Sequence, residues 1–214
     1  MAEIILKLMQ AASTNSSEIG LYQKFENASS LMESGISSIG GTLAPSVSLL
    51  NHSCDPNTIK IFNKGTIILM ASRIIKEGEE VLSTYSYNFA EADKKKRQEY
   101  LKRKYCFDCQ CRACDENWPI KEEVPKNFDD LRQGQLLVDL GNSMGLMQQV
   151  TKIQKLGSSI SQEQKAGNYK KAFGLCIEFS KVLEDTIGRP HAYYMMSEKS
   201  MFKLAWIIYG SISM

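Results

Sequence analysis

Four cysteines fall within nine residues of this chain, in the stretch CFDCQCRAC from Cys106 to Cys114. Thiols this close together either pair or bind a metal, and both outcomes fix the local backbone strongly. Zn²⁺ takes four tetrahedral ligands, with each sulfur at about 2.3 Å, and suits so dense a cluster. The sequence therefore predicts a zinc-stabilised segment here, in preference to a set of reduced thiols that bind nothing.

The remainder of the chain favours a metal over disulfides. The first stretch, MAEIILKLMQ, has Glu3 where a secretory signal carries its positive region, and no apolar run is long enough to span a membrane. We therefore expect a reducing compartment, cytoplasmic or nuclear or both. The 214 residues carry a net charge of only +2, so we expect neither a membrane partner nor direct nucleic-acid binding.

The spacing of the cysteines leaves the fourth metal ligand open. The four local thiols could close the site by themselves, but the short step from Cys109 to Cys111 crowds one side of it. A distant ligand would tie the segment to the rest of the fold, and the candidate is Cys54 in the polar stretch LLNHSCDPN. That stretch could also be a solvated turn, because Asp55-Pro56-Asn57 is a good turn sequence.

Local patterns indicate helices and a small sheet. Residues 4–12 favour a short helix, and two β-rich runs, 67–71 and 80–85, are joined by a Lys-Glu-Gly turn. Residues 27–42 are rich in Ser and Gly, which indicates a loop or short strand pieces. A helical pattern begins at residue 90 and ends at the cysteines, and its basic run KKKRQEYLKRK is expected to be a solvated helix face.

The last part of the chain, residues 127–214, shows helical periodicity interrupted by glycines. Its segments have about the length of helix pairs in a tetratricopeptide-like array. If the outer layer of such an array is missing, the final segment FKLAWIIYGSISM should expose Phe202, Trp206 and Ile207. This apolar patch would then bind a partner protein or promote self-association.

The order of the motifs resembles a known family. SLLNHSCDPN, a strand that ends in a tyrosine (VLSTY) and a helix that runs into KYCFDCQCRAC are similar to the SMYD-type (SET and MYND) protein-lysine methyltransferases. The resemblance implies an α+β fold, with a small, mainly antiparallel SET core, a zinc-bound post-SET segment and an α-helical, tetratricopeptide-like region. The expected boundaries are 1–100 for a partial SET domain, 101–118 for the post-SET segment and 119–214 for the helical region.

The resemblance also implies roles for single residues. Tyr85 and Tyr105 would be the catalytic pair that walls a lysine channel. S-adenosylmethionine would be bound by polar and aromatic side chains, namely Asn15, Ser48, Asn51, His52, Tyr85 and Phe107, with the Phe107 ring on the adenine. Zn²⁺ would be held by Cys54, Cys109, Cys111 and Cys114, which leaves Cys106 as a spare thiol. The lysine amine must be neutral to accept a methyl group, and an apolar channel favours that state by lowering its pKa from about 10.4.

Two parts of the family pattern have no counterpart in this sequence, the Gly-x-Gly strand that opens the SET domain and the MYND zinc finger. We therefore expect the C-terminal portion of a longer enzyme that methylates a lysine of a histone or non-histone protein, and an isolated chain that is inactive. The alternative is a non-catalytic, zinc-stabilised interaction module that binds a protein through its helical tail.

Overall fold

The computed structural model describes residues 2–24, 34–124, 126, 143–210 and 212–213. The helices are α1 (Ala2–Asn15), α2 (Pro45–Ser48), α3 (Lys94–Tyr105), α4 (Arg112–Asp115), α6 (Ser143–Lys165), α7 (Tyr169–Thr186) and α8 (Ala192–Tyr209). The strands are β1 (Ser16–Lys24), β2 (Ser34–Leu43), β3 (Asn51–His52), β4 (Thr58–Asn63), β5 (Thr66–Ala71), β6 (Leu82–Ser83) and β7 (Ile212–Ser213). The predicted α+β class is confirmed.

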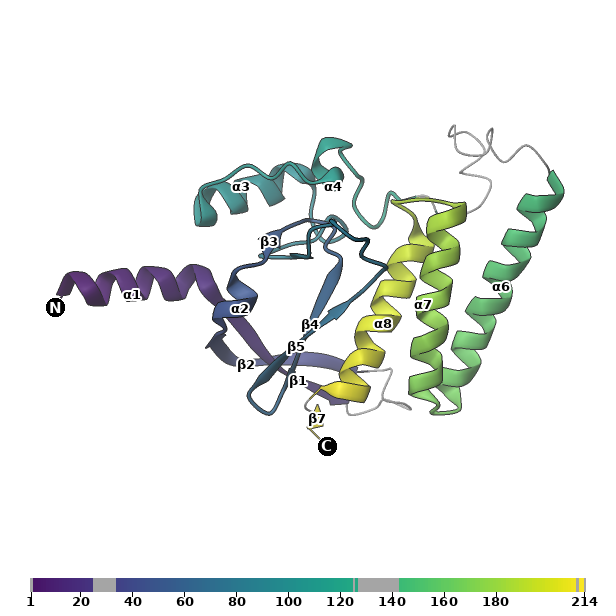
Figure 1. Cartoon of the computed structure of the whole chain (residues 1–214), viewed down its shortest axis with the longest axis horizontal. Helices are drawn as coiled ribbons and strands as arrows, with labels where there is room; N and C mark the ends of the chain where they lie inside the picture. Colours follow the sequence, from purple (N-terminus) through teal and green to yellow (C-terminus); the bar gives the residue numbers. More distant parts are fainter. Residues whose placement is uncertain (1, 25–33, 125, 127–142, 211, 214) are drawn as a thin grey trace.

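The strands form the middle of the molecule, between two groups of helices (Figure 1). α3 and α4 lie on one side, near β3, while α6, α7 and α8 form a layer on the right of the view. α1 extends away from the body at the opposite end from this layer. The small β core therefore has α3 and α4 above it and the helical tail beside it in this view.

Three small sheets make up the β core. β1 pairs with β2 and β4 pairs with β5, both antiparallel, whereas β3 pairs with β6 in parallel. The register of β1 and β2 shifts between Ile19 and Gly20. A Cβ built on Gly20 would lie 2.3 Å from the Ile36 side chain, so this irregular position requires glycine.

The predicted run 67–71 is confirmed as β5, but its partner was not predicted. β5 pairs with β4 across a tight turn in which Lys64 and Gly65 have φ of 44° and 86°. Two consecutive positive φ values are typical of a type I′ hairpin, in which glycine is strongly favoured. The predicted run 80–85 contains only the two-residue β6, which pairs with β3 and not with β5.

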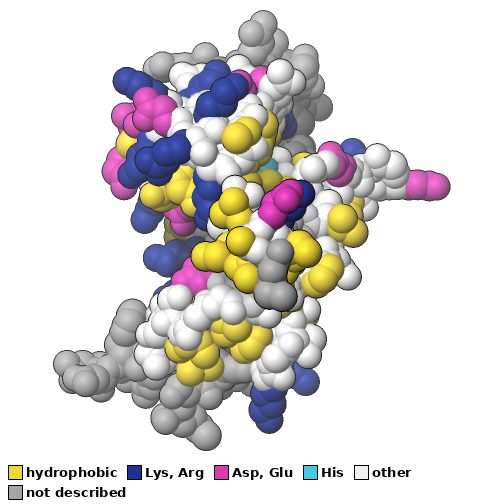
Figure 2. Space-filling model, turned by 90° about the vertical axis from the view of Figure 1, so that its left-hand side faces the viewer, with side chains coloured by type: hydrophobic (Ala, Val, Ile, Leu, Met, Phe, Trp, Pro, Cys, Tyr) yellow, Lys and Arg dark blue, Asp and Glu magenta, His cyan; other side chains and the backbone are white. Residues whose placement is uncertain are grey.

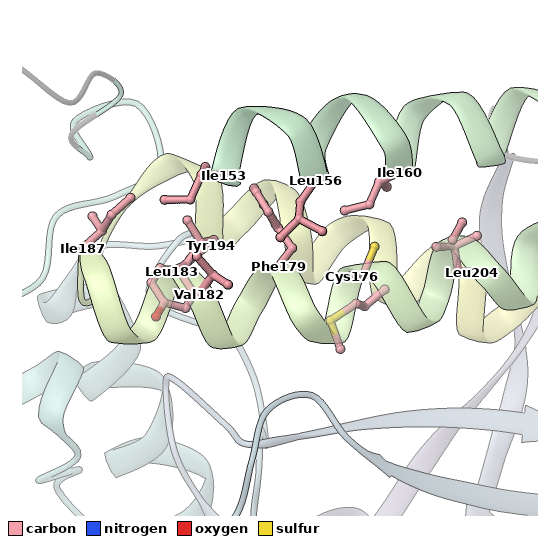
Figure 3. Packing of buried hydrophobic residues seen from close by; sticks show 12 residues of the cluster. Ile153, Leu156, Ile160, Cys176, Phe179, Val182, Leu183, Ile187, Tyr194 and Leu204 are labelled. Carbon is pink, nitrogen blue, oxygen red and sulfur yellow. The ribbon is translucent and has the colours of Figure 1, made fainter. Parts of the chain in front are cut away.

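The helical tail buries an apolar stripe from each of its three helices. Ile153, Leu156 and Ile160 of α6 face the buried residues of α7 and α8 (Figure 3). Their spacing of three and four residues is that of one helix face. Leu183 of α7 is fully buried, which contributes about 1.5–3 kcal/mol relative to an exposed side chain. The sixth cysteine, Cys176, belongs to this core, and burial raises the pKa of its thiol to about 12.

The end of α8 packs against the β core. Trp206 is only 4% exposed, and its ring stacks on Tyr22 of β1 at 6.2 Å between centroids. Phe202 and Ile207 are half-buried against the same cluster, which also contains Ile61 of β4. The prediction of an exposed apolar patch at these positions was therefore wrong, because the apolar face of α8 is covered by the chain's own strands.

The N-terminal helix α1 has no buried residue. Its large apolar side chains are all more than half exposed, namely Ile4, Ile5, Leu6, Leu8 and Met9.

Figure 2 views the molecule from the side on which α1 extends. Hydrophobic side chains gather near the middle of this face, while Lys and Arg gather at its upper left. None of the described helices combines the length and the apolar character that crossing a bilayer would need.

Candidate functional site

Four cysteines from two distant parts of the chain meet at one point. The sulfur atoms of Cys54, Cys109, Cys111 and Cys114 all lie within 4.8 Å of one another, and those of Cys54 and Cys114 are 3.6 Å apart. Tetrahedral ligation at about 2.3 Å places sulfurs about 3.8 Å apart, so the cluster has the dimensions of a four-thiolate zinc site. Cys54, and not Cys106, is the fourth thiol of this cluster.

Cys106 lies outside this group, at the position where α3 ends. It is the C-cap of α3, with φ of 61°, and its N–H donates to the Lys102 carbonyl at 3.1 Å. The left-handed conformation ends the helix and sends the chain toward Cys109. Its own side chain is exposed.

The inner face of α3 holds the cysteine loop in place. The Gln98 amide forms two hydrogen bonds with the backbone of Cys109, donating to its carbonyl at 2.7 Å and accepting from its N–H at 2.8 Å. Arg97, the residue before Gln98, is fully buried beside Cys114. Arg97 is thus an exception to the expected solvated helix face, since it lies on the side of α3 that packs against the protein.

His52 links the cysteine cluster to an aromatic group. Its Nδ1 accepts a hydrogen bond from the Tyr85 backbone N–H at 3.0 Å, and its Nε2 lies 3.4 Å from the Cys54 sulfur. An accepting Nδ1 requires the proton on Nε2, which then donates to sulfur. Burial lowers the pKa of His52 to about 4, so the ring stays neutral at physiological pH.

Tyr85, Tyr105 and Phe107 form the aromatic group, and each is half-buried. The rings of Tyr85 and Tyr105 have centroids 4.9 Å apart, and Phe107 meets the Tyr85 ring edge-on at 6.4 Å. The Tyr85 hydroxyl donates to the Leu50 carbonyl at 2.6 Å, and the Tyr105 hydroxyl donates to the Tyr85 carbonyl at 3.5 Å. Burial raises the pKa of Tyr85, which keeps its hydroxyl protonated.

The turn sequence after Cys54 is not a solvated turn. Asn57 is fully buried, and its side-chain oxygen accepts from the Leu82 N–H at 2.8 Å while its amide donates to the Glu80 carbonyl at 2.8 Å. Thr58 adds a hydrogen bond to the Leu82 carbonyl at 2.7 Å. These bonds fix β6, which leads directly into Tyr85.

The predicted polar cofactor residues lie in two pairs. The Ser48 hydroxyl donates to the Asn15 carbonyl at 2.8 Å, which brings two residues 33 positions apart into contact. Asn51 is exposed, and its amide donates to the Glu80 carboxylate at 2.6 Å. The structure therefore places Asn15 beside Ser48, and Asn51 next to His52 on β3.

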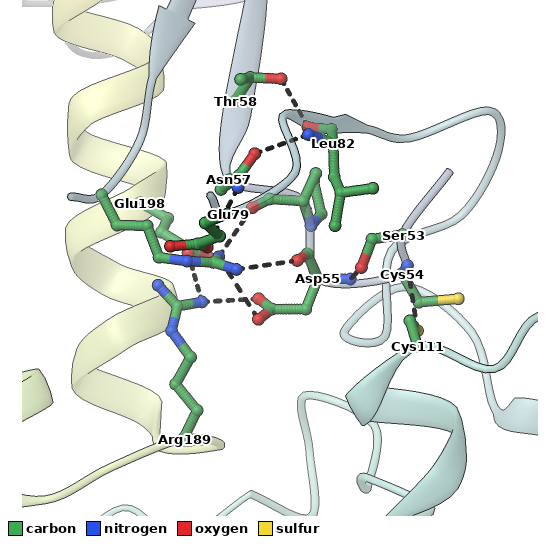
Figure 4. Close-up of polar contacts among 12 residues, drawn as sticks. Ser53, Cys54, Asp55, Asn57, Thr58, Glu79, Leu82, Cys111, Arg189 and Glu198 are labelled. Atoms are coloured by element: carbon green, nitrogen blue, oxygen red, sulfur yellow. Dashed lines mark hydrogen bonds and ion pairs between the residues drawn. The ribbon is translucent and has the colours of Figure 1, made fainter. Parts of the chain in front are cut away.

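A buried ion cluster connects this loop to the helical tail (Figure 4). Arg189 contacts the carboxylates of Asp55 at 2.6 Å and Glu198 at 2.7 Å, and Arg73 contacts Asp55 at 3.5 Å. The side chains of Arg189 and Asp55 are 5% and 9% exposed. Sequence analysis did not find this cluster, since its paired residues Asp55 and Arg189 are 134 positions apart and no local pattern pairs them.

Comparison with known proteins agrees with this geometry. The SET domain family matches residues 7–86, a range that includes His52, Cys54 and Tyr85. Human histone-lysine N-methyltransferase SMYD3 is 34% identical over 119 residues, which cover 50% of this chain and 27% of that protein. Histone-lysine N-methyltransferase ASHR1 of Arabidopsis thaliana is 34% identical over 116 residues, 53% of this chain and 24% of that protein.

A third relative extends over more of the chain. Mouse protein-lysine N-methyltransferase SMYD4 is 30% identical over 162 residues, which cover 69% of this chain and 20% of that protein. The chain thus spans about a quarter or less of the length of these relatives. The SET match includes the histidine, cysteine and tyrosine that join the two halves of the site, and these relatives carry SMYD names, so this part of the chain is similar to the SMYD-type SET-domain proteins.

Proposed function

We propose that this chain carries the lysine-binding and cofactor-binding residues of an S-adenosylmethionine-dependent protein-lysine N-methyltransferase. One observation carries the proposal: the aromatic group of Tyr85, Tyr105 and Phe107 is fastened to the cysteine cluster by His52. A site that encloses a lysine between aromatic rings needs rigid rings, and here both the rings and their backbone are tied to a compact cluster. The relatives are named histone-lysine N-methyltransferase and protein-lysine N-methyltransferase, which agrees with this proposal.

The aromatic group suits a lysine amine in two ways. Apolar ring faces disfavour the ammonium form, which lowers the pKa of a lysine between them and makes its lone pair available. Each tyrosine hydroxyl already donates to a backbone carbonyl, so its oxygen is left to accept a hydrogen bond from the amine. Tyr85 and Tyr105 therefore orient the amine, and Tyr85 does not serve as a strong base, because burial keeps its hydroxyl protonated.

The cofactor residues would lie on the β3 side of the aromatic group. S-adenosylmethionine supplies an electrophilic methyl group on a sulfonium. We assign its polar contacts to Asn15, Ser48, Asn51 and His52, and its adenine contact to Phe107. Two observations fit this set: Phe107 is half-exposed next to His52, at 6.0 Å between ring centroids, and the Asn51 side chain is exposed. Since both His52 ring nitrogens are occupied, we assign its contact to the backbone.

We propose that the cysteine cluster binds one structural Zn²⁺. The four sulfurs have the right spacing, and N–H donors from Cys54 and Arg97 point to two of them, as is usual for thiolate ligands. Four thiolates would fill the tetrahedral coordination of the metal, so its role would be structural. It would hold the post-SET segment, 101–118, against the partial SET domain, residues 1–100. Residues 119–214 would form the helical region.

The substrate class follows from the relatives and is proposed here as a lysine of a histone or non-histone protein, in the cytoplasm, the nucleus or both. The rival hypothesis, a non-catalytic, zinc-stabilised module that binds a protein through its helical tail, is not favoured. Trp206, which was expected to be exposed on that tail, is buried against Tyr22.

The test combines cofactor binding with methyl transfer. The zinc-loaded chain should bind S-adenosylmethionine in a calorimeter, and Phe107→Ala should weaken binding about tenfold, because stacking of a base on an aromatic ring contributes about 1–3 kcal/mol. Because the isolated chain is expected to be inactive, transfer of labelled methyl to mixed histones is measured after an upstream SET half has been restored. That transfer should fall at least about tenfold in Tyr85→Phe, as expected for lost orientation. Tyr209→Phe, at an exposed tyrosine of α8, is the matched control. Unchanged binding in Phe107→Ala together with unchanged transfer in Tyr85→Phe would refute the proposal.

A further inference from the structure

Arg97 is the largest fully buried side chain among the described residues. It lies on α3, in a run of otherwise mainly exposed basic residues, and its exposed fraction is 0%. Arginine stays protonated in proteins, so its positive charge is buried along with the side chain. A buried charge is costly unless an opposite charge lies nearby.

Among the described residues, no carboxylate pairs with Arg97 to provide that opposite charge. The described contacts of the Arg97 guanidinium are three backbone carbonyls, those of Phe89, Ala92 and Ala113, and the sulfur of Cys114 at 3.8 Å. Its Nε is buried without a hydrogen-bond partner among the described residues. Carbonyl dipoles satisfy hydrogen bonds, but they supply no net negative charge.

The cysteine cluster can provide it. Cysteines bind zinc as thiolates, so four of them around one Zn²⁺ carry a net charge of −2. Cys54 and Cys114 are both fully buried, so this negative charge is poorly solvated on the side facing α3. A guanidinium next to Cys114 would then stabilise the thiolate set while the set stabilises the guanidinium.

We propose that Arg97 is the counter-charge of the metal site and sets its affinity for Zn²⁺, with the side chain acting through Cys114 and not as a ligand. The inference rests on the proposed zinc site but is independent of methyl transfer. It also explains why one arginine of the basic run turns inward while Lys95, Lys96, Arg103 and Lys104 remain on the exposed side.

The first measurement is the zinc dissociation constant of the full chain in competition with a chelating dye. Arg97→Met keeps much of the length and removes the charge, and it should weaken zinc binding about 10- to 100-fold, as is typical for groups that support metal ligands. Arg97→Lys keeps the charge and should recover part of this loss. The control is Arg103→Met, the same substitution at an exposed position of the same helix, which should leave the constant within about twofold.

A second measurement separates charge from packing. If Arg97 only fills space, Arg97→Met should lower the melting temperature of the metal-free and zinc-loaded chains equally, and Arg97→Lys should not restore zinc affinity. If it is the counter-charge, most of the loss should appear in the zinc-loaded chain. Wild-type zinc affinity in Arg97→Met, or equal losses in both forms, would overturn the inference. Absence of zinc binding by the unaltered chain would instead overturn the zinc site itself.

Discussion

His52 shows at the scale of one residue how the two halves of the site depend on each other. One ring nitrogen accepts from the Tyr85 backbone and the other lies against the Cys54 sulfur. A change in the position of Cys54 is therefore transmitted to the ring that would enclose the substrate. The sequence indicated His52 and Cys54 as functional residues, but it could not show that the histidine connects the metal cluster to the tyrosine.

Cys54 and Cys106 provide the sharpest test at this scale. Cys54→Ser removes one of the four clustered thiols and should abolish stoichiometric zinc binding, measured as metal content by mass spectrometry of the intact protein. Cys106→Ser changes an exposed thiol outside the cluster and should retain about one zinc per chain. Equal loss of zinc in both variants, or loss only in Cys106→Ser, would show that the cluster is not the binding site.

Chelation of the metal should then have a local effect. Structural zinc contributes folding free energy directly, so its removal should loosen the post-SET segment while the core of α6, α7 and α8 remains folded. The buried residues of that core differ from those around the cysteines, and Ala192 and Met195 at the start of α8 pack against the cysteine side.

At the scale of secondary-structure elements, the sequence indicated the long helices and the strand β5 but gave a poor account of the sheet. β5 and β6 were both expected, yet each pairs with a strand that had not been predicted, β4 and β3. Strand pairing depends on residues that are distant in sequence, whereas a helix closes its hydrogen bonds locally. The hairpin signal Asn63-Lys64-Gly65 was present in the sequence and would have located β4.

Lys60 on β4 leads to a prediction about stability and pH. Its Nζ has one described partner, the Thr84 carbonyl at 3.4 Å, and burial lowers the pKa of the amine. The unfolded chain therefore binds a proton more tightly than the folded chain, so this lysine opposes folding below its lowered pKa. Lys60→Met should raise the melting temperature near neutral pH.

The gain from Lys60→Met should shrink as pH rises through the lowered pKa toward about 10.4, where the unfolded amine also loses its proton. Thermal unfolding followed by circular dichroism at several pH values measures this. Lys95→Met, at an exposed lysine of α3, should show no such trend. A gain that is absent at neutral pH, or that grows at high pH, would contradict the assigned burial effect.

At the scale of the whole molecule, the buried ion cluster connects the helical tail to the loop after Cys54. Asp55 directly follows Cys54, and Glu198 lies on α8, so Arg189 joins the loop of the cysteine site to the tail. The two arginines and two carboxylates balance in charge, which makes their burial tolerable. Together with the contact of Trp206 and Tyr22, this cluster makes the tail part of the same folded unit.

We expect the free energy of unfolding to fall by different amounts when different members of the cluster are replaced by neutral residues. Arg189→Met leaves Asp55 and Glu198 to share Arg73, and should lower the free energy of unfolding by about 3–5 kcal/mol, the usual cost of stranding a buried charge. Asp55→Asn should cost less, because Arg189 keeps Glu198 at 2.7 Å. The loss in the double variant should be smaller than the sum of the two, since the second change removes a charge that the first has stranded.

Denaturant unfolding of the four proteins in this cycle measures the coupling directly. The control is Lys152→Met, which breaks an ion pair between α6 and α7 whose side chains are both 51% exposed, and which should cost at most about 1 kcal/mol because water already solvates both charges. If Arg189→Met costs no more than this control, the cluster does not hold the tail to the core. If it costs several times more while α6, α7 and α8 stay helical, the tail is anchored to the loop of the cysteine site through Asp55, and a change in the tail can reach the metal cluster without touching a metal ligand.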